Sequence, residues 1–212
     1  MILLFDMYGV IIKESGGITP YIAERRPDID RNFLRETYVE ASVGRYGNHE
    51  FFKKLGFGDP DHAMADYIER HLTFDSKFIT FAEKFINTHA FALLSNDILD
   101  WSEYIRARYG IEKYFTESVV SANAGCRKPG RRIYEIILER LGVPADECVF
   151  IDDKAENLIP AEALGMHAVL FGRGGEQYDG DTVHDFDGLA RLIESKYDNK
   201  TYARGVPSRK NL

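Results

Sequence analysis

Apolar residues of this chain gather in short runs that end on polar residues. The first run, at 1–5, leads directly into Asp6, and later runs lead into Ser95 and Asp152. A short apolar run closed by a polar residue is typical of a central strand in a parallel sheet, because such a strand is buried on both faces. Between the runs, apolar residues recur at helical spacing. The alternation predicts an α/β fold with a doubly wound parallel sheet.

The second part of the chain has a regular rhythm of strands and helices. Gly142 is an expected helix terminator, whereas Pro160 should interrupt a helix, because proline is tolerable only within about the first turn. The glycine-rich stretch 172–180 is predicted to be a loop. The elements expected after residue 74 are helices at 77–87, 101–109, 132–141, 156–164 and 186–195, and strands at 89–95, 118–121, 149–151 and 168–171.

Residues 19–72 show helical spacing and no strand-like alternation. Pro20 can open a helix, and breaks at 26–27, 44–48 and 56–60 predict three or four helices. A helical stretch between the first strand and the rest of a sheet indicates an inserted lobe.

Gly16 and Gly17 permit the sharp departure of the backbone that such an insertion needs. Residues 196–212 carry five Lys or Arg, one acidic residue and few residues that form cores, which indicates a surface tail. The predicted organisation is an α/β core at 1–13 and 76–195, an inserted helical lobe at 14–75, and a polar C-terminal tail at 196–212.

Composition limits the classes of partner. The net charge of -7 and the pI near 5.4 argue against nucleic acid, which requires a basic face, and favour a small metabolite. No stretch reaches the roughly 20 apolar residues of a membrane helix, and the N-terminus does not resemble a signal peptide. We therefore expect a cytoplasmic protein, monomeric or homodimeric, with no membrane partner. Two cysteines without paired metal-ligand spacing suggest neither a disulfide framework nor a zinc site.

Four polar positions stand at strand ends or loops of the predicted sheet: Asp6, Ser95, Lys128 and the pair Asp152-Asp153. Ligands of open α/β sheets bind at the carboxyl ends of the strands, so we expect these side chains to converge there. Converging carboxylates repel one another, and a hard divalent cation such as Mg²⁺ removes the conflict. Together with the lysine and the hydroxyl, these groups describe a phosphoryl pocket in which Asp6 attacks.

Each of these residues also has an ordinary structural interpretation. Asp6 could simply end a strand or cap a helix, and Ser95 could be a helix N-cap. Lys128 precedes a proline and could be a surface residue, while Asp152-Asp153 could be an N-cap and a first-turn acid. The functional interpretation depends on all of them meeting in one place.

Together the motifs resemble the haloacid dehalogenase-like hydrolase superfamily, in the order that this superfamily has them. The segment 5–10 resembles its nucleophile motif, Leu94-Ser95-Asn96 its second motif, Arg127-Lys128-Pro129 its lysine motif, and 150–157 its acidic motif. The resemblance implies a Rossmann-like core, a helical cap inserted after the first motif, and a hinge at 13–17.

The resemblance also implies roles for individual residues. Asp6 would be the covalent nucleophile, with Tyr8, Ser95 and Lys128 as further catalytic positions and Ser95, Asn96 and Lys128 as substrate contacts. Mg²⁺ would be held by Asp6, the carbonyl of Tyr8 and Asp153, with Asp152 acting through water.

Tyr8 departs from the commonest phosphatase pattern of the superfamily, which has a second aspartate there as general acid and base. The 2-haloacid dehalogenases carry tyrosine at this position and need no metal, but their acidic motif generally lacks the paired aspartates. Since two further carboxylates without a metal would oppose a nucleophilic anion, Asp152 and Asp153 favour the phosphatase.

We therefore predict a Mg²⁺-dependent phosphatase that acts on a small phosphorylated metabolite through an aspartyl-phosphate. The alternatives are a 2-haloacid dehalogenase and a catalytically weakened binding or regulatory protein. A response-regulator receiver is disfavoured, because its acidic pair follows the first strand, whereas Asp152-Asp153 lies late in this chain.

Overall fold

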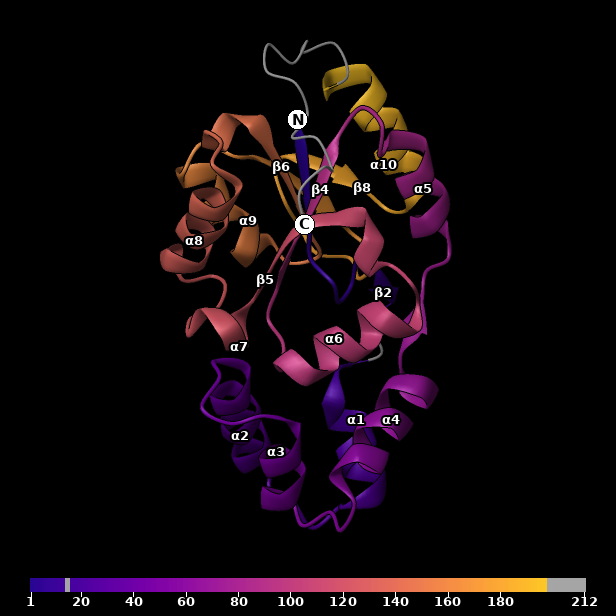
Figure 1. Cartoon of the computed structure of the whole chain (residues 1–212), viewed down its shortest axis with the longest axis vertical. Coiled ribbons are helices and arrows are strands. Elements are labelled where there is room, and N and C mark those ends of the chain that lie inside the picture. The colour runs from indigo at the N-terminus through magenta and orange to yellow at the C-terminus, as the bar shows by residue number, and fades with distance from the viewer. Residues whose placement is uncertain (14–15, 198–212) are drawn as a thin grey trace.

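A six-stranded parallel sheet forms the centre of the computed structural model, which describes residues 1–13 and 16–197 (Figure 1). Every pair of neighbouring strands is parallel, as a doubly wound sheet requires. The strands in spatial order are β5 (Phe115–Val120), β4 (Ala90–Ser95), β1 (Ile2–Phe5), β6 (Cys148–Asp152), β7 (His167–Phe171) and β8 (Asp181–Val183). The predicted fold class is confirmed.

The central strand β1 lies between β4 and β6 in matched register. Phe5 is paired with Leu93 on one side and with Ile151 on the other. The carboxyl ends of the three strands are therefore level, and the polar residues that follow them meet at one edge of the sheet.

Helices cover both faces of the sheet (Figure 1). On one face, α8 (Arg131–Leu141) and α9 (Ala155–Ala163) share an apolar cluster with Leu4 of β1. On the other face, α5 (Lys77–Phe85) and α10 (Phe186–Leu192) pack against Phe5, whose ring lies 5.6 Å from that of Phe78. Successive residues of β1 thus face opposite helix layers, which explains why the whole strand is apolar.

Four helices form the inserted lobe: α1 (Ile18–Arg25), α2 (Arg31–Ser42), α3 (Asn48–Lys54) and α4 (Pro60–His71). The first three end at the predicted breaks. Asp30 and Asp59 cap α2 and α4 by accepting hydrogen bonds from first-turn N–H groups. A short antiparallel pair, β2 (Ile12–Lys13) and β3 (Thr73–Phe74), connects the lobe to the sheet.

The helix α6 (Leu99–Arg108) lies between the sheet and the lobe (Figure 1). Its Trp101 is buried and packs against Phe51 of α3 and Tyr67 of α4, with ring centroids 5.3 and 5.2 Å apart. The indole Nε1 donates a 2.8 Å hydrogen bond to Oδ1 of Asn48. A helix of the α/β part thus supplies the largest side chain of the lobe's apolar interior.

Some elements differ from the sequence-based expectation. The helix α9 continues through Pro160, because the carbonyl that loses its donor belongs to Glu156, an exposed residue of the first turn. The edge strand β8 follows the predicted glycine-rich loop; it was not predicted, and it is short. The remaining elements are α7 (Ser121–Ala124) and short helical segments at Glu112–Tyr114, Ala145–Glu147 and Ile193–Tyr197.

Tyr197 is buried and belongs to the last helical segment, which therefore extends two residues into the expected tail. Residues 198–212 of that tail lie outside the described residues. None of the helices that the structure describes is both long enough and apolar enough to cross a membrane.

Candidate active site

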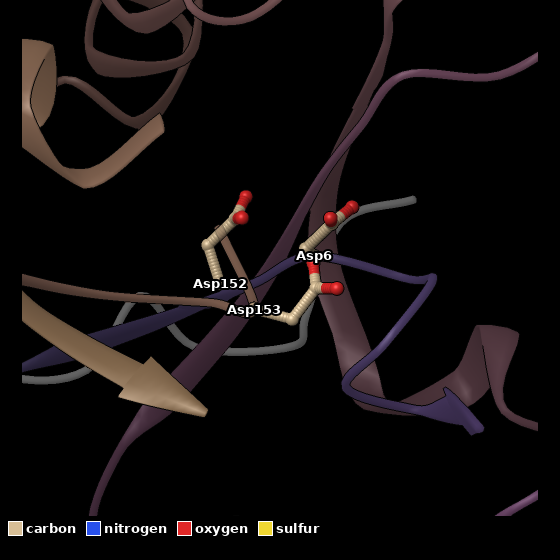
Figure 2. Close-up of side chains that lie close together, drawn as sticks. All are labelled: Asp6, Asp152 and Asp153. Carbon is tan, nitrogen blue, oxygen red and sulfur yellow. The ribbon is translucent and has the colours of Figure 1, made fainter. Parts of the chain in front are cut away.

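Three carboxylates lie close together at the carboxyl ends of the central strands β1 and β6 (Figure 2). Asp6 follows β1, Asp152 is the last residue of β6, and Asp153 comes directly after it. Carboxylate oxygens from all three lie within 4.8 Å of one another. Asp6 and Asp152 are buried and Asp153 is half-buried, so the convergence expected from the sequence is present.

The loop after Asp6 passes very close to Asp153. Gly9 has a φ of +77°, and a Cβ at this position would lie 2.2 Å from the carboxyl group of Asp153. Only glycine permits both the left-handed backbone and the contact. Gly9 therefore fixes how closely the first loop approaches the acidic pair.

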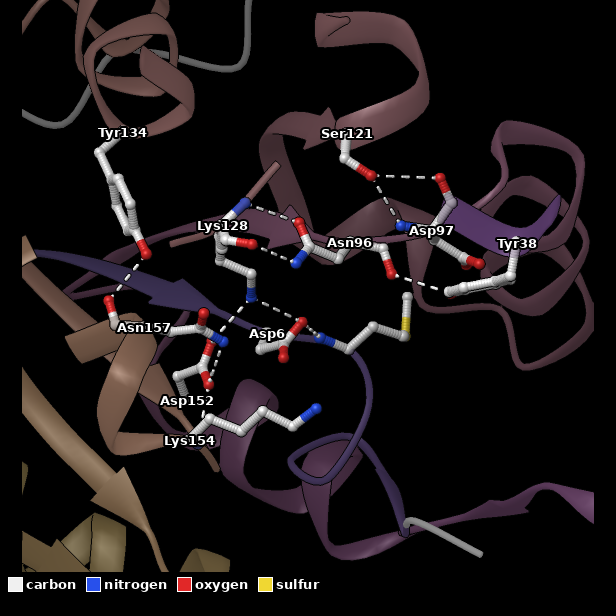
Figure 3. Close-up of polar contacts among 11 residues, drawn as sticks. Asp6, Tyr38, Asn96, Asp97, Ser121, Lys128, Tyr134, Asp152, Lys154 and Asn157 are labelled. Atoms are coloured by element: carbon white, nitrogen blue, oxygen red, sulfur yellow. Dashed lines mark hydrogen bonds and ion pairs between the residues drawn. The ribbon is translucent and has the colours of Figure 1, made fainter. Parts of the chain in front are cut away.

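Lys128 binds two of the carboxylates (Figure 3). Its Nζ lies 3.0 Å from Oδ1 of Asp6 and 2.7 Å from Oδ2 of Asp152, and its side chain is completely enclosed. The interpretation of Lys128 as a surface residue is wrong. A buried lysine needs such partners, since an unpaired charge in the interior is very costly.

Asp152 is held by donors on both oxygens. Oδ1 accepts from the backbone N–H of Lys154, and both oxygens accept from Nδ2 of Asn157, at 2.9 and 3.1 Å. Nζ of Lys128 also donates to Oδ2, so each carboxylate oxygen of Asp152 accepts two hydrogen bonds from protein groups. Asp152 therefore orients Lys128, and Asn157 in turn orients Asp152.

The side chain of Asn96 forms two hydrogen bonds with the backbone of Lys128. Its Oδ1 accepts from the backbone N–H of Lys128, and its Nδ2 donates to the carbonyl of the same residue, both at 2.9 Å (Figure 3). The side chain thus pairs with the backbone as a neighbouring strand would. Asn96 also lines the cavity described below, as does Lys128.

Ser95 ends β4 and is fully buried, and its Oγ has no hydrogen-bond partner among the described residues. The N-cap of the following helix is Ile98, so the interpretation of Ser95 as a helix cap is wrong. A buried hydroxyl without a partner costs free energy, and a ligand oxygen at the site would remove that cost.

Tyr8 is paired with an acid that the sequence analysis missed. Its hydroxyl donates a 3.1 Å hydrogen bond to Oδ2 of Asp97, which is fully buried. Burial raises the pKa of both groups well above their usual values. Asp97 is the second residue after β4, and its place directly after Ser95 and Asn96 was the only signal in the sequence.

The charges at the site influence one another. Burial raises the pKa of Asp6; Lys128 opposes this and the carboxylate of Asp152 adds to it. Burial alone would lower the pKa of Lys128, but Asp152 and Asp6 more than offset this, so the pKa is raised. The lysine therefore stays protonated, and its positive charge favours the anionic form of Asp6 against the effect of burial.

A cavity of about 340 Å³ opens above these groups, between the α/β core and the lobe. This volume is at the small end of the range of small-molecule pockets. Its walls combine residues of the core and of the lobe, which are Asp6, Tyr8, Asn96, Arg127, Lys128, Pro129, Asp153, Lys154, Glu156 and Asn157, and Gly16, Gly17, Ile18, Thr19, Tyr38 and Tyr67.

Comparison with known proteins gives one family match. The sequence model of a family described as haloacid dehalogenase-like hydrolase matches residues 1–165. Phosphatase MT3486 of Mycobacterium tuberculosis (strain CDC 1551 / Oshkosh) is 39% identical over 70 residues, which cover 33% of this chain and 32% of that protein. The glyceraldehyde 3-phosphate phosphatase of Methanocaldococcus jannaschii is 28% identical over 105 residues, which cover 46% and 45%. The chain thus spans less than half the length of either relative.

The fold is also similar to solved structures. A HAD family enzyme from Bacteroides thetaiotaomicron superposes with a TM-score of 0.72 at 20% identity, covering 83% of this chain and 95% of that one. At this identity the likeness shows the fold alone.

Proposed function

This chain belongs to the haloacid dehalogenase-like hydrolase family, and from that membership we propose that it is a Mg²⁺-dependent phosphatase. Its substrate is a small phosphorylated metabolite, and the reaction passes through an aspartyl-phosphate at Asp6. The observation that carries the proposal is the enclosed contact of Lys128 with Asp6. The buried hydroxyl of Ser95, which has no hydrogen-bond partner among the described residues, supports it. The two curated relatives described above are named as phosphatases, which supports it.

Asp6 is oriented for attack by two donors on the same oxygen. The backbone N–H of Met7, at 2.7 Å, and Nζ of Lys128, at 3.0 Å, both contact Oδ1. We assign the attack to Oδ2: it forms a bond to phosphorus while the bond from phosphorus to the leaving oxygen breaks. Water then attacks the same phosphorus while the bond from phosphorus to Oδ2 breaks, which releases phosphate and restores the carboxylate of Asp6. A proton of that water balances the charge of the departed alkoxide.

Lys128 and Ser95 stabilise the phosphoryl group during these steps. The ammonium of Lys128 offsets negative charge on the phosphoryl oxygens, and the hydroxyl of Ser95 donates to one of them. Asn96 holds the backbone of Lys128 in place, so the cation needs no rearrangement when the substrate binds.

The residues at the site fit Mg²⁺. Three carboxylates with oxygens within 4.8 Å of one another offer the oxygen donors that this ion prefers. Asp6, Asp153 and the carbonyl of Tyr8 would hold it, while Asp152, whose oxygens already accept from protein donors, would act through water. When bound, the ion would offset the charge of the carboxylates and of the phosphoryl group.

A 2-haloacid dehalogenase remains the second candidate, because Tyr8 stands where those enzymes carry tyrosine. The three close carboxylates argue against it, since without a cation they would oppose a second anion at the site. A binding protein without turnover is the third candidate.

The deciding experiment is a panel of phosphorylated metabolites and 2-haloacids, assayed with Mg²⁺ and with EDTA. We expect phosphate release that requires Mg²⁺ and that Asp6→Asn lowers by several orders of magnitude. Chloride release from 2-chloropropionate in EDTA would establish the dehalogenase instead. Binding of a phosphate mimic without turnover of any compound would establish the binding protein.

A further inference from the structure

Three tyrosine side chains line the cavity that also contains Lys128. Tyr8 of the first loop, Tyr38 of α2 and Tyr67 of α4 line the same cavity as Asp6. We call these three residues the tyrosine wall. The other described lobe residues at the cavity are uncharged as well, and they are Gly16, Gly17, Ile18 and Thr19.

Two hydroxyls of the tyrosine wall are bound within the protein. Tyr8 donates to Oδ2 of Asp97 at 3.1 Å, and Tyr38 donates to the carbonyl of Asn96 at 3.3 Å. A ligand in the cavity therefore meets rings of these residues rather than free hydroxyls.

Ring contacts with Trp101 of α6 and Phe51 of α3 hold two members of the tyrosine wall in position. The ring of Tyr38 lies 6.0 Å from that of Trp101 and 6.3 Å from that of Phe51, and the ring of Tyr67 lies 5.2 Å from that of Trp101. Because these neighbours are buried, the rings have fixed orientations before any ligand binds. A fixed aromatic surface selects flat partners, since offset-stacked and edge-to-face contacts depend on geometry.

We propose that the leaving group of the substrate is an uncharged aromatic ring, or a similarly flat unsaturated group, seated against Tyr8, Tyr38 and Tyr67. This rests on the proposed phosphatase function for the phosphoryl end of the substrate. A polyol leaving group fits poorly, because its hydroxyls would be buried against rings and each would lose its partners in water. The cavity of about 340 Å³ admits one ring system beside the phosphoryl group.

The test uses pairs of compounds that differ only in the flatness of the ring. Benzylphosphonate and cyclohexylmethylphosphonate are compared as competing ligands in the presence of Mg²⁺. Benzyl phosphate and cyclohexylmethyl phosphate are compared as substrates. The two leaving groups, benzyl alcohol and cyclohexylmethanol, are similar in size and acidity. A difference in turnover therefore does not come from the ease with which the leaving group departs. We expect the benzyl compound to be favoured about three- to tenfold, the size of one aromatic contact.

Variants at two positions, Tyr38 and Tyr67, assign the preference to the wall. Tyr38→Phe keeps the ring and should keep the benzyl preference, whereas Tyr38→Leu keeps apolar volume and should reduce it to within about twofold. Tyr67→Leu is the second variant, in case Tyr38→Leu does not fold. Equal affinity of the wild type for both phosphonates, or an unchanged preference in both leucine variants, would overturn the inference.

The outcomes separate this inference from the proposed function. Turnover of both phosphates without a benzyl preference removes the flat leaving group and leaves the phosphatase. A benzyl preference in phosphonate binding without turnover of either phosphate removes the phosphatase and leaves the aromatic site. If neither phosphonate binds, the inference fails.

Discussion

The hydroxyl of Tyr8 donates its hydrogen bond to Oδ2 of Asp97, a carboxyl group with no exposed surface. Tyr8 stands two residues after Asp6, where the commonest phosphatases of the family carry their general acid. In this chain the residue at that position is Tyr8, whose hydroxyl is hydrogen-bonded to the buried carboxyl group of Asp97. The structure thus favours Tyr8 as an anchor of the first loop and as a wall of the cavity, rather than as a proton donor.

Removal of the Tyr8 hydroxyl tests this directly. Tyr8→Phe should change kcat by less than about threefold, because general acid–base assistance is worth about 10² to 10⁴ and would be lost only if the hydroxyl supplied it. The same variant should lower the free energy of unfolding by about 1–3 kcal/mol, because a buried oxygen of Asp97 loses its donor. Turnover of an aryl phosphate and urea unfolding measure the two effects. A hundredfold loss of kcat would restore Tyr8 as the acid.

Introduction of the missing acid gives the opposite experiment. Tyr8→Asp should raise activity on alkyl phosphates more than on aryl phosphates, because alkoxides need protonation most as they leave. Rates across leaving groups of graded pKa, measured for both forms, should give a steeper dependence in the wild type. Equal and shallow slopes in the two forms would point to an acid supplied by another residue.

Asp97 should make stability depend on pH. Burial raises its pKa in the folded state, whereas in the unfolded chain an aspartate ionises near pH 4. Above that pH the unfolded chain releases a proton that the folded state retains, so this group destabilises the fold progressively as the pH rises toward its folded pKa. Asp97→Asn cannot ionise, and its stability relative to the wild type should increase between pH 4.5 and pH 8.

Urea unfolding at several pH values measures this difference. Asp146→Asn, a change at an exposed residue, is the matched control. A difference between Asp97→Asn and the wild type that stays constant with pH would show that Asp97 is ionised in the folded state.

Asp153 is expected to affect turnover through the binding of Mg²⁺. Asp153→Asn removes one negative charge from the carboxylate cluster, so the Mg²⁺ concentration that gives half-maximal turnover should rise at least tenfold. Glu156→Gln removes the same charge from an exposed residue of the same cavity and should leave that concentration nearly unchanged. A wild-type Mg²⁺ response in Asp153→Asn would exclude Asp153 from the coordination shell.

Trp101 should connect the stability of the lobe to that of the α/β core. Trp101→Ala removes a buried ring and the donor to Asn48, and should lower the free energy of unfolding by about 3–5 kcal/mol. Tyr104→Phe, which removes only an exposed contact with Glu69 from the same helix, should cost less than about 0.5 kcal/mol. Urea unfolding compares them, and similar losses in the two variants would contradict the structural role of Trp101.

The sequence sufficed for features that depend on neighbours in the chain. The apolar runs before Asp6 and Asp152 are strands, and the resemblance drawn from four short motifs is confirmed by the family match over 1–165. The first three lobe helices end where Pro and Gly break the helical spacing. Local chemistry determined these features, and local patterns predicted them.

Features that depend on distant contacts were not predictable. Nothing near Asp97 shows that Tyr8, 89 residues away, donates to it, and nothing near Trp101 shows that it packs against the lobe. Pro160 lies inside a helix because the surroundings of α9 tolerate one missing hydrogen bond at an exposed turn. In each case packing in three dimensions determined the outcome.

The position of Trp101 also limits how this chain can be recombined with its relatives. A chimera that exchanges residues 14–75 alone would present Trp101 to foreign helices and would remove the Asn48 oxygen that its indole binds. A crossover that carries Leu99–Arg108 together with the lobe keeps that contact intact. The unit of exchange is therefore discontinuous in the chain, and shuffling at the borders of the insertion would break contacts that both segments must inherit together.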